Sequence, residues 1–227
     1  MIFVTGDTHG TKDATKLGNS QLKGLSRDDL LIICGDAGIL FNPRETEDML
    51  NLYSYLPYSV AFVDGNHENF DMLDSYPIKK WNEGFVHRIS ENVVHLMRGQ
   101  VYVLEGRRFF AFGGGCSYDR HLRTPGTDWW SQEMPDKAEF DEGLRNIRRY
   151  NLQVNCVVTH DCPSHLLGEL VEHSSKLRSY GVKECESNRM LESYSRIVSF
   201  DRWFFGHYHV DRNFGKYRCV FNDVVKV

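Results

Sequence analysis

Short apolar runs recur along the chain, and each ends at a glycine or a polar residue, which predicts buried strands. Five of these runs are rich in β-branched or aromatic residues and span residues 2–4, 30–34, 60–63, 154–158 and 203–205. Between them, apolar residues at helical spacing predict helices over residues 44–56, 136–150 and 187–199. Strands that alternate with helices favour parallel pairing, because a parallel strand needs a long crossover connection.

The middle of the chain has a different pattern. Three apolar runs, at residues 93–96, 101–104 and 109–112, are separated by short polar breaks, which predicts an antiparallel meander. A further strand is predicted over residues 217–221. The expected fold class is therefore α/β, with two mixed β-sheets that pack together and outer helices, in a single domain over residues 1–227.

Two stretches do not fit this pattern of elements. The segment from Gly113 to Pro135 carries three glycines at its start and then a mixture of charged and aromatic residues. Long irregular loops in compact domains are often functional, so we predict that this segment faces a substrate. The alternative is a surface excursion that Trp129 and Trp130 pin to the core. The other stretch, residues 166–186, is polar and predicts no clear helix boundary.

The composition narrows the class of protein. Hydrophobic residues make up 41% of the chain and charged residues 26%, which is typical of a globular protein with a core. The net charge of −4 argues against broad electrostatic adhesion to nucleic acid or anionic lipid, while leaving room for a local basic pocket. The first residues lack the features of a signal peptide, and no apolar run approaches the roughly 18 residues of a membrane helix. We therefore expect a cytoplasmic protein.

The six cysteines have no C-x-x-C spacing. Cys34 and Cys156 lie inside apolar runs and Cys219 inside a predicted strand, which is typical of small buried residues rather than of a disulfide framework. Cys156 and Cys162 lack the second pair that a zinc knuckle needs. Structural thiols are therefore favoured over a redox role.

A residue that can bind a metal ion follows each of the five predicted strands. In the order of the strands, these residues are Asp7 and His9, then Asp36, then Asn66 and His67, then His160, and last His207 and His209. Ligands bind at the carboxyl ends of the strands in open α/β sheets, so we expect these side chains to converge there.

The types of side chain in this set suit divalent metal ions. Such ions accept carboxylate oxygen, imidazole nitrogen and amide oxygen together. Asp-x-His and His-x-His at a strand end let alternate residues project from one side, and one carboxylate can bridge two ions. A lone Asp, His or Asn at a strand end is usually a turn, cap or structural residue. The repetition after five apolar runs favours a metal site instead.

The motifs GDTHG, GDA, GNHE, TH and GHYH resemble, in this order, those of the calcineurin-like metallophosphoesterases, and they span nearly the whole chain. The resemblance implies a four-layer sandwich of two mixed β-sheets flanked by helices. It also implies two divalent metal ions, with Mn²⁺ expected first and Fe or Zn as alternatives. The implied ligands are Asp7, His9 and His209 for one ion, Asn66, His160 and His207 for the other, and Asp36 as the bridge.

The activity that this resemblance implies is hydrolysis of a phosphate mono- or diester by in-line attack of a metal-bridging water or hydroxide. His67 matches the family's histidine that stabilises the phosphoryl group and protonates the leaving oxygen, a contribution of roughly 10²–10⁴-fold. Glu68 is expected to support the turn rather than to bind a metal ion.

The second motif departs from that of the protein serine/threonine phosphatases. They carry GDxxDRG, whereas this chain has GDAGIL, so Ile39 and Leu40 replace an Asp that supports the catalytic histidine and an Arg that binds phosphate. A phosphorylated small molecule or nucleotide is therefore the preferred substrate, and a phosphoprotein is the alternative. A cationic clamp must come from elsewhere, and the candidates are His121 and Arg123, followed by Arg120, Arg44 and Arg212.

A scaffold without catalytic activity and a nuclease are the two alternatives to a phosphoesterase. A catalytically silent scaffold, such as the retromer subunit that resembles this family, is disfavoured because no ligand position is lost. A nuclease is disfavoured because the chain is short and has no strong basic stripe. We expect neither membrane binding nor stable nucleic-acid binding, and the sequence predicts no oligomeric state.

Overall fold

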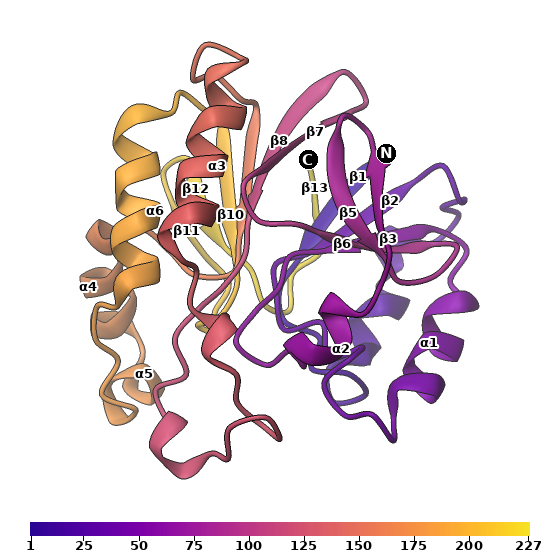
Figure 1. Ribbon diagram of the computed structural model, residues 1–227, viewed down its shortest axis with the longest axis horizontal. Helices are drawn as coiled ribbons and strands as arrows, with labels where there is room; N and C mark the ends of the chain where they lie inside the picture. The colour runs from indigo at the N-terminus through magenta and orange to yellow at the C-terminus, as the bar shows by residue number, and fades with distance from the viewer.

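Two β-sheets pack face to face in the computed structural model, which describes residues 1–227 (Figure 1). The seven-stranded sheet consists, from edge to edge, of β13 (Val225–Lys226), β1 (Ile2–Thr5), β2 (Leu30–Ile33), β3 (Ser59–Phe62), β6 (Val93–Leu96), β5 (Gly84–Arg88) and β4 (Ile78–Trp81). The six-stranded sheet consists of β11 (Arg212–Phe214), β12 (Tyr217–Cys219), β10 (Arg202–Phe205), β9 (Cys156–Thr159), β8 (Arg107–Phe112) and β7 (Gln100–Leu104). Each sheet is mixed, with parallel central strands and antiparallel edges.

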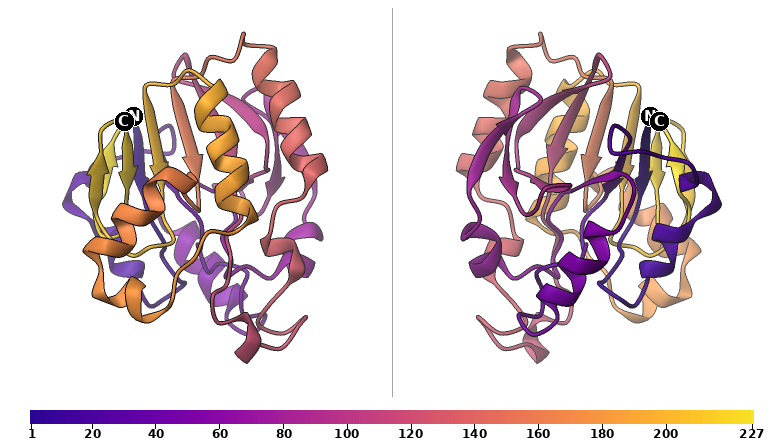
Figure 2. Two further views of the ribbon diagram at one scale, coloured as in Figure 1. Left: turned by 90° about the vertical axis from the view of Figure 1, so that its left-hand side faces the viewer. Right: turned by 90° about the vertical axis from the view of Figure 1, so that its right-hand side faces the viewer.

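Helices cover the outer face of each sheet (Figures 1 and 2). The three predicted helices are present as α1 (Thr46–Ser54), α3 (Lys137–Arg148) and α6 (Glu186–Ile197). The other helices and 3-10 turns are α2 (Phe70–Asp74), α4 (Ser164–His173), α5 (Ser175–Ser179), η1 (Ala14–Gly18), η2 (Ser20–Leu22), η3 (Arg120–Leu122) and η4 (Ser131–Glu133). None of the helices has the length and apolar character needed to cross a bilayer.

Alternate residues of the central strands face two different layers of the core. On β8, Phe109 packs between the two sheets, whereas Phe110 faces the helices and lies with its ring centroid 4.9 Å from that of Tyr194 on α6. On β2, Ile32 faces the other sheet and Leu31 faces the helical layer that contains Met49 of α1. Burial on both faces explains the continuous apolar runs and confirms the predicted fold class of two mixed sheets flanked by helices.

The meander predicted over residues 93–112 is wrong in one respect. β7 and β8 form an antiparallel hairpin, but β6 belongs to the other sheet, where it lies between β3 and β5. The short connection between β6 and β7 therefore carries the chain from one sheet to the other. The β4–β5 hairpin was not predicted, because its edge strand presents the exposed side chains of Ile78, Lys79 and Lys80 rather than an apolar run.

A buried ion pair holds the loop that follows β3. Arg98 donates from Nε to the Asp64 carboxylate (2.9 Å), and His95 Nε2 lies 3.1 Å from the same carboxylate. Arg98 also donates to Glu139 of α3 (2.9 Å), so it connects the loop to the opposite helical layer. Burial alone would raise the pKa of Asp64, but Arg98 and His95 hold it well below its ordinary value. The carboxylate is thus charged inside the protein.

Replacing Arg98 with alanine should destabilise the protein strongly, because Asp64 would remain as an unpaired buried charge. We expect a loss of about 3–5 kcal/mol in the free energy of unfolding, measured by urea denaturation. Arg145→Ala, at an exposed position of α3, is the matched control and should change stability by less than about 0.5 kcal/mol. Equal stabilities of the two variants would show that the ion pair does not hold the fold.

Candidate metal centre

The turns after β1, β2, β3, β9 and β10 bring the strand-end residues together in the seam between the two sheets. Four of these residues have left-handed backbone conformations, namely His9, Asp36, His207 and His209, with φ between 43° and 68°. Non-glycine residues rarely adopt this conformation, which costs on the order of 1–3 kcal/mol each. Such strain persists where the surrounding structure fixes it and is concentrated at functional sites.

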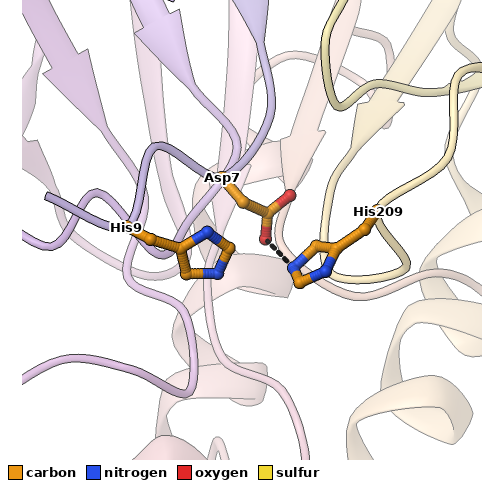
Figure 3. Close-up of side chains that lie close together, drawn as sticks. All are labelled: Asp7, His9 and His209. Atoms are coloured by element: carbon orange, nitrogen blue, oxygen red, sulfur yellow. Dashed lines mark ion pairs between the residues drawn. The ribbon is translucent and has the colours of Figure 1, made fainter. Parts of the chain in front are cut away.

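The first group of ligand atoms belongs to Asp7, His9 and His209, whose atoms lie within 4.8 Å of one another. His9 and His209 lie on either side of the Asp7 carboxylate, and Asp7 Oδ1 is 3.8 Å from His209 Nε2 (Figure 3). The backbone N–H of His207 donates to the Asp7 carboxylate at 3.1 Å. His9 Nδ1 lies 2.8 Å from Asp13, which orients the ring and leaves Nε2 facing the site.

The second group surrounds Nε2 of His160. This atom lies 3.1 Å from Asn66 Oδ1, 3.1 Å from His207 Nδ1 and 3.6 Å from Asp36 Oδ1. His160 Nδ1 donates to the backbone carbonyl of Cys34 at 2.8 Å, which turns Nε2 toward the other three atoms. Carboxylate, amide and imidazole donors that converge in this way fit a divalent ion.

The Asp36 carboxylate lies between the two groups. Its Oδ2 is 3.5 Å from His9 Nε2, and its Oδ1 is 3.6 Å from His160 Nε2. The backbone N–H of His67 donates to Oδ1 at 2.7 Å and holds the carboxylate in this position. Gly65 is also required here, because a Cβ atom at residue 65 would lie 2.1 Å from Asp36 Oδ1. Asp36 thus lies within 3.6 Å of an imidazole nitrogen of each group.

Burial controls the protonation of the site. It lowers the pKa of His209 to about 4 and also lowers the pKa values of His67 and His207, so these imidazoles are neutral at pH 7. Burial raises the pKa of Asp7 to about 6. Although burial acts in the same direction on Asp36, the neighbouring histidines hold the pKa of Asp36 well below its ordinary value. In the opposite direction, Asp36 and Asp7 raise the pKa of His9 to about 9 and raise the pKa of His160, so a metal cation that binds these two rings would displace their protons.

Two residues that support the site, Ser117 and Glu133, were not predicted from the sequence. Asn66 Nδ2 donates to Ser117 Oγ (3.1 Å), and Ser117 Oγ donates in turn to Glu133 (2.6 Å). Ser117 and Glu133 are both buried, and this chain of hydrogen bonds turns the amide oxygen of Asn66 toward His160. No motif marks either residue, because both lie in the irregular 113–135 segment and meet Asn66 only in the folded protein.

Glu68 has the supporting role that we expected from the sequence. Its Oε1 accepts a hydrogen bond from the backbone N–H of Ala37 at 3.1 Å, which ties the loop after β3 to the loop after β2. Its side chain is buried, and it belongs to neither group of metal-ligand atoms.

Two adjoining pockets open above these ligands, with volumes of about 930 Å³ and about 450 Å³. Of the predicted substrate-facing residues, His67 and Arg123 line both pockets, and His121 lines the smaller one. Arg123 already forms a bidentate ion pair with Asp119, at 2.7 and 2.8 Å. Lys176 of α5 also lines both pockets and was not predicted. The lower-ranked candidates Arg44, Arg120 and Arg212 line neither pocket.

The 113–135 segment has both a part that lines a pocket and a part that is anchored to the core, which were the two alternatives that its sequence left open. Tyr118 and Arg123 line the smaller pocket, so part of the segment faces the metal centre. Trp130 is buried, and its indole N–H donates to Asp71 of α2 at 2.8 Å, so another part is anchored to the core. The anchor holds the pocket-lining part in place.

Comparisons with known proteins agree with this architecture. A family model described as calcineurin-like phosphoesterase matches residues 1–211. A phosphopantetheinyl hydrolase from Mycobacterium tuberculosis has a similar fold, with a TM-score of 0.50 and 16% identity over 97% of this chain and 87% of that one. A protein of unknown function from Aquifex aeolicus gives a TM-score of 0.39 and 14% identity, over 86% of this chain and 92% of that one. No curated protein matched in sequence.

Replacing Asp36 with asparagine should abolish metal binding at one or both sites, because the position between the two groups would lose its negative charge. We expect Mn²⁺ affinity to fall by more than about 100-fold, measured by calorimetric titration of the metal-free protein. Asp28→Asn, at an exposed position before β2, should bind Mn²⁺ like the wild type. Unchanged stoichiometry and affinity in Asp36→Asn would rule out the bridging position.

Ser117→Ala should weaken Mn²⁺ binding without changing its stoichiometry, since Asn66 would lose the partner that orients its amide. The expected effect is about 10–100-fold in affinity, the range typical of residues that hold a metal ligand in place. The same titration of Ser131→Ala, an exposed serine of the same segment, provides the control. Equal affinities in the two variants would contradict the orienting role.

Proposed function

This chain belongs to the calcineurin-like phosphoesterase family, and on that premise we propose that it is a binuclear metal-dependent phosphoesterase. Its proposed substrate is a phosphate mono- or diester of a small molecule or nucleotide. The observation that carries the proposal is the position of Asp36 between two groups of ligand atoms, about 3.5 Å from each. One carboxylate in that position can bridge two ions.

The donor set suggests which ions the protein would hold. We propose that Asp7, His9 and His209 hold one ion, that Asn66, His160 and His207 hold the other, and that Asp36 contacts both. The oxygen donors of this set suit Mn²⁺, which we propose first, whereas its imidazoles also suit the alternatives Fe and Zn. When bound, two such ions would lower the pKa of a water molecule and neutralise charge on the phosphoryl oxygens.

His67 is the proposed catalytic residue of the chain itself. Its backbone is fixed by the hydrogen bond to Asp36, and its ring lies in the cleft, 6.0 Å from the ring of His9 and 5.8 Å from that of Phe41. Burial lowers the pKa of His67, but an anionic ester beside it would favour the protonated ring. The imidazole can therefore gain a proton as substrate binds and transfer it to the leaving oxygen.

The loop after β2 favours a small substrate over a phosphoprotein. Ile39 and Leu40 stand where the protein serine/threonine phosphatases carry their Asp and Arg, and both are buried in the apolar layer beneath α1. They cannot contact a phosphate. A silent scaffold is also disfavoured, because every predicted ligand lies in the seam between the sheets.

The Mn²⁺-loaded protein should hydrolyse an aryl phosphate ester such as p-nitrophenyl phosphate or bis(p-nitrophenyl) phosphate, and a chelator should abolish the activity. His67→Ala should retain its metal ions, measured by elemental analysis after desalting, and lose roughly 10²–10⁴-fold in kcat. His173→Ala, at an exposed position of α4, is the control. Failure to cleave either ester would refute the proposed function, while metal loss in His67→Ala would refute only the role of that residue.

A further inference from the structure

We propose that the substrate is a phosphodiester that places a polar, hydrogen-bonding group in the larger pocket and an aromatic or apolar group in the smaller one. This inference rests on the proposed function and adds the class of substrate. We call the larger pocket the polar arm, lined by Lys12, Asp13, Asn42 and Glu45. We call the smaller one the aromatic arm, lined by Tyr118, Leu177, Tyr180 and Val182.

The two arms meet above the candidate metal centre. His67, Arg123, Lys176 and His209 line both arms, so they mark the junction. Asp36 lines the aromatic arm and His9 lines the polar arm, and these two side chains are 3.5 Å apart. A phosphorus atom bound at this junction therefore has open cleft on two sides. A diester has one substituent for each arm. A monoester would occupy one arm and leave the other arm filled with water.

The aromatic arm has the surface of a binding pocket rather than of a core. Leu177 and Val182 are buried at its base, but Tyr180, at the end of α5, is 59% exposed. Exposed large aromatic side chains beside a pocket supply stacking surface for a ring or an apolar chain. Tyr118, on the 113–135 segment, packs near His207 with a ring-centroid distance of 5.6 Å and connects this surface to the junction.

The walls of the polar arm offer hydrogen-bonding groups to a ligand. The carboxyl groups of Asp13 and Glu45 line it together with Lys12, and the junction residues Arg123 and Lys176 add two further cations. Asn42 Nδ2 donates to Glu45 at 2.8 Å, which holds that carboxylate at the pocket wall. Carboxylates and an amide accept hydrogen bonds from hydroxyl and amide groups. The group that enters this arm is therefore polar and able to donate hydrogen bonds.

The junction also carries a cation that can contact a bound phosphate. The guanidinium of Arg123 is neutralised by its bidentate pair with Asp119. Lys176 forms no ion pair, and its ammonium group lies 5.8 Å from the ring centroid of Tyr180, so it can neutralise charge on a ligand at the junction. Hydrolysis of a diester adds water to phosphorus and breaks one ester P–O bond, with the proton going to the leaving oxygen. The products are a phosphate monoester and an alcohol.

Kinetics with a matched pair of esters tests the inference. We expect the Mn²⁺-loaded protein to have a higher kcat/KM for bis(p-nitrophenyl) phosphate than for p-nitrophenyl phosphate. Tyr180→Ala should raise the KM for the diester by about 3- to 10-fold, from the loss of aromatic packing, with a much smaller change in kcat. Tyr55→Ala, which removes a tyrosine that is 86% exposed on the far side of α1, is the control. Because Tyr180 is exposed, its replacement does not threaten folding.

Binding of inert anions supplies a readout that does not depend on turnover. Diphenylphosphinate carries one charge and two aryl groups, and phenylphosphonate carries one aryl group; neither has an ester bond. In calorimetric titrations, diphenylphosphinate should bind more tightly, and Tyr180→Ala should reduce that preference. Preferred turnover of the monoester, together with an unchanged KM in Tyr180→Ala, would overturn the diester inference and leave the proposed function standing. Hydrolysis of neither ester would instead refute the proposed function.

Discussion

The compensation of two buried carboxylates is the constraint on which the rest of this structure depends. Asp7 and Asp36 are almost completely buried in the seam between the sheets, where an unpaired negative charge is strongly unfavourable. Imidazole rings surround them, and those of His207 and His209 are neutral at pH 7 because burial lowers their pKa values. The two carboxylates raise the pKa of His9 to about 9 and raise that of His160, so these imidazoles compensate the negative charge as long as no ion is bound, and divalent cations would take over that role. Metal binding and stability are coupled in such a site.

The two-sheet architecture is what assembles this site. β1, β2 and β3 of one sheet deliver Asp7, Asp36 and Asn66, whereas β9 and β10 of the other deliver His160 and His207. Neither sheet holds a complete set for either ion in the proposed assignment. The parallel strands of both sheets must end at the same edge of the sandwich, and their turns must accept left-handed backbone at four ligand positions. Packing between the sheets thus sets the distances between ligands.

The parts that could be predicted from the sequence are those in which one local pattern determines one structural feature. Buried strands on both faces produce continuous apolar runs, and their ends locate the ligand candidates, so Asp7, Asp36 and His160 could be placed without a structure. The path of the β6–β7 connection could not be predicted, because a connection that changes sheet and a hairpin turn can have the same length and polarity. The roles of Ser117 and Glu133 could not be predicted either, since Ser117 meets Asn66 across 51 residues of chain and Glu133 acts on Asn66 only through Ser117.

The same distinction explains why the reaction is easier to derive than the substrate. Strand ends are fixed by the hydrogen-bonded sheets, so the ligand set follows from the fold. The cleft walls come from the 113–135 segment, the loop before α1 and the short helix α5, which are adjacent only after folding. Lys176 is an example of a cleft residue that the sequence does not reveal, because nothing in the polar stretch around it distinguishes it from a surface lysine. Only the folded cleft brings Lys176 into the lining of both pockets with Arg123, whose charge Asp119 already neutralises. Which cation of the cleft lacks an ion-pair partner is therefore a property of the folded protein rather than of any motif.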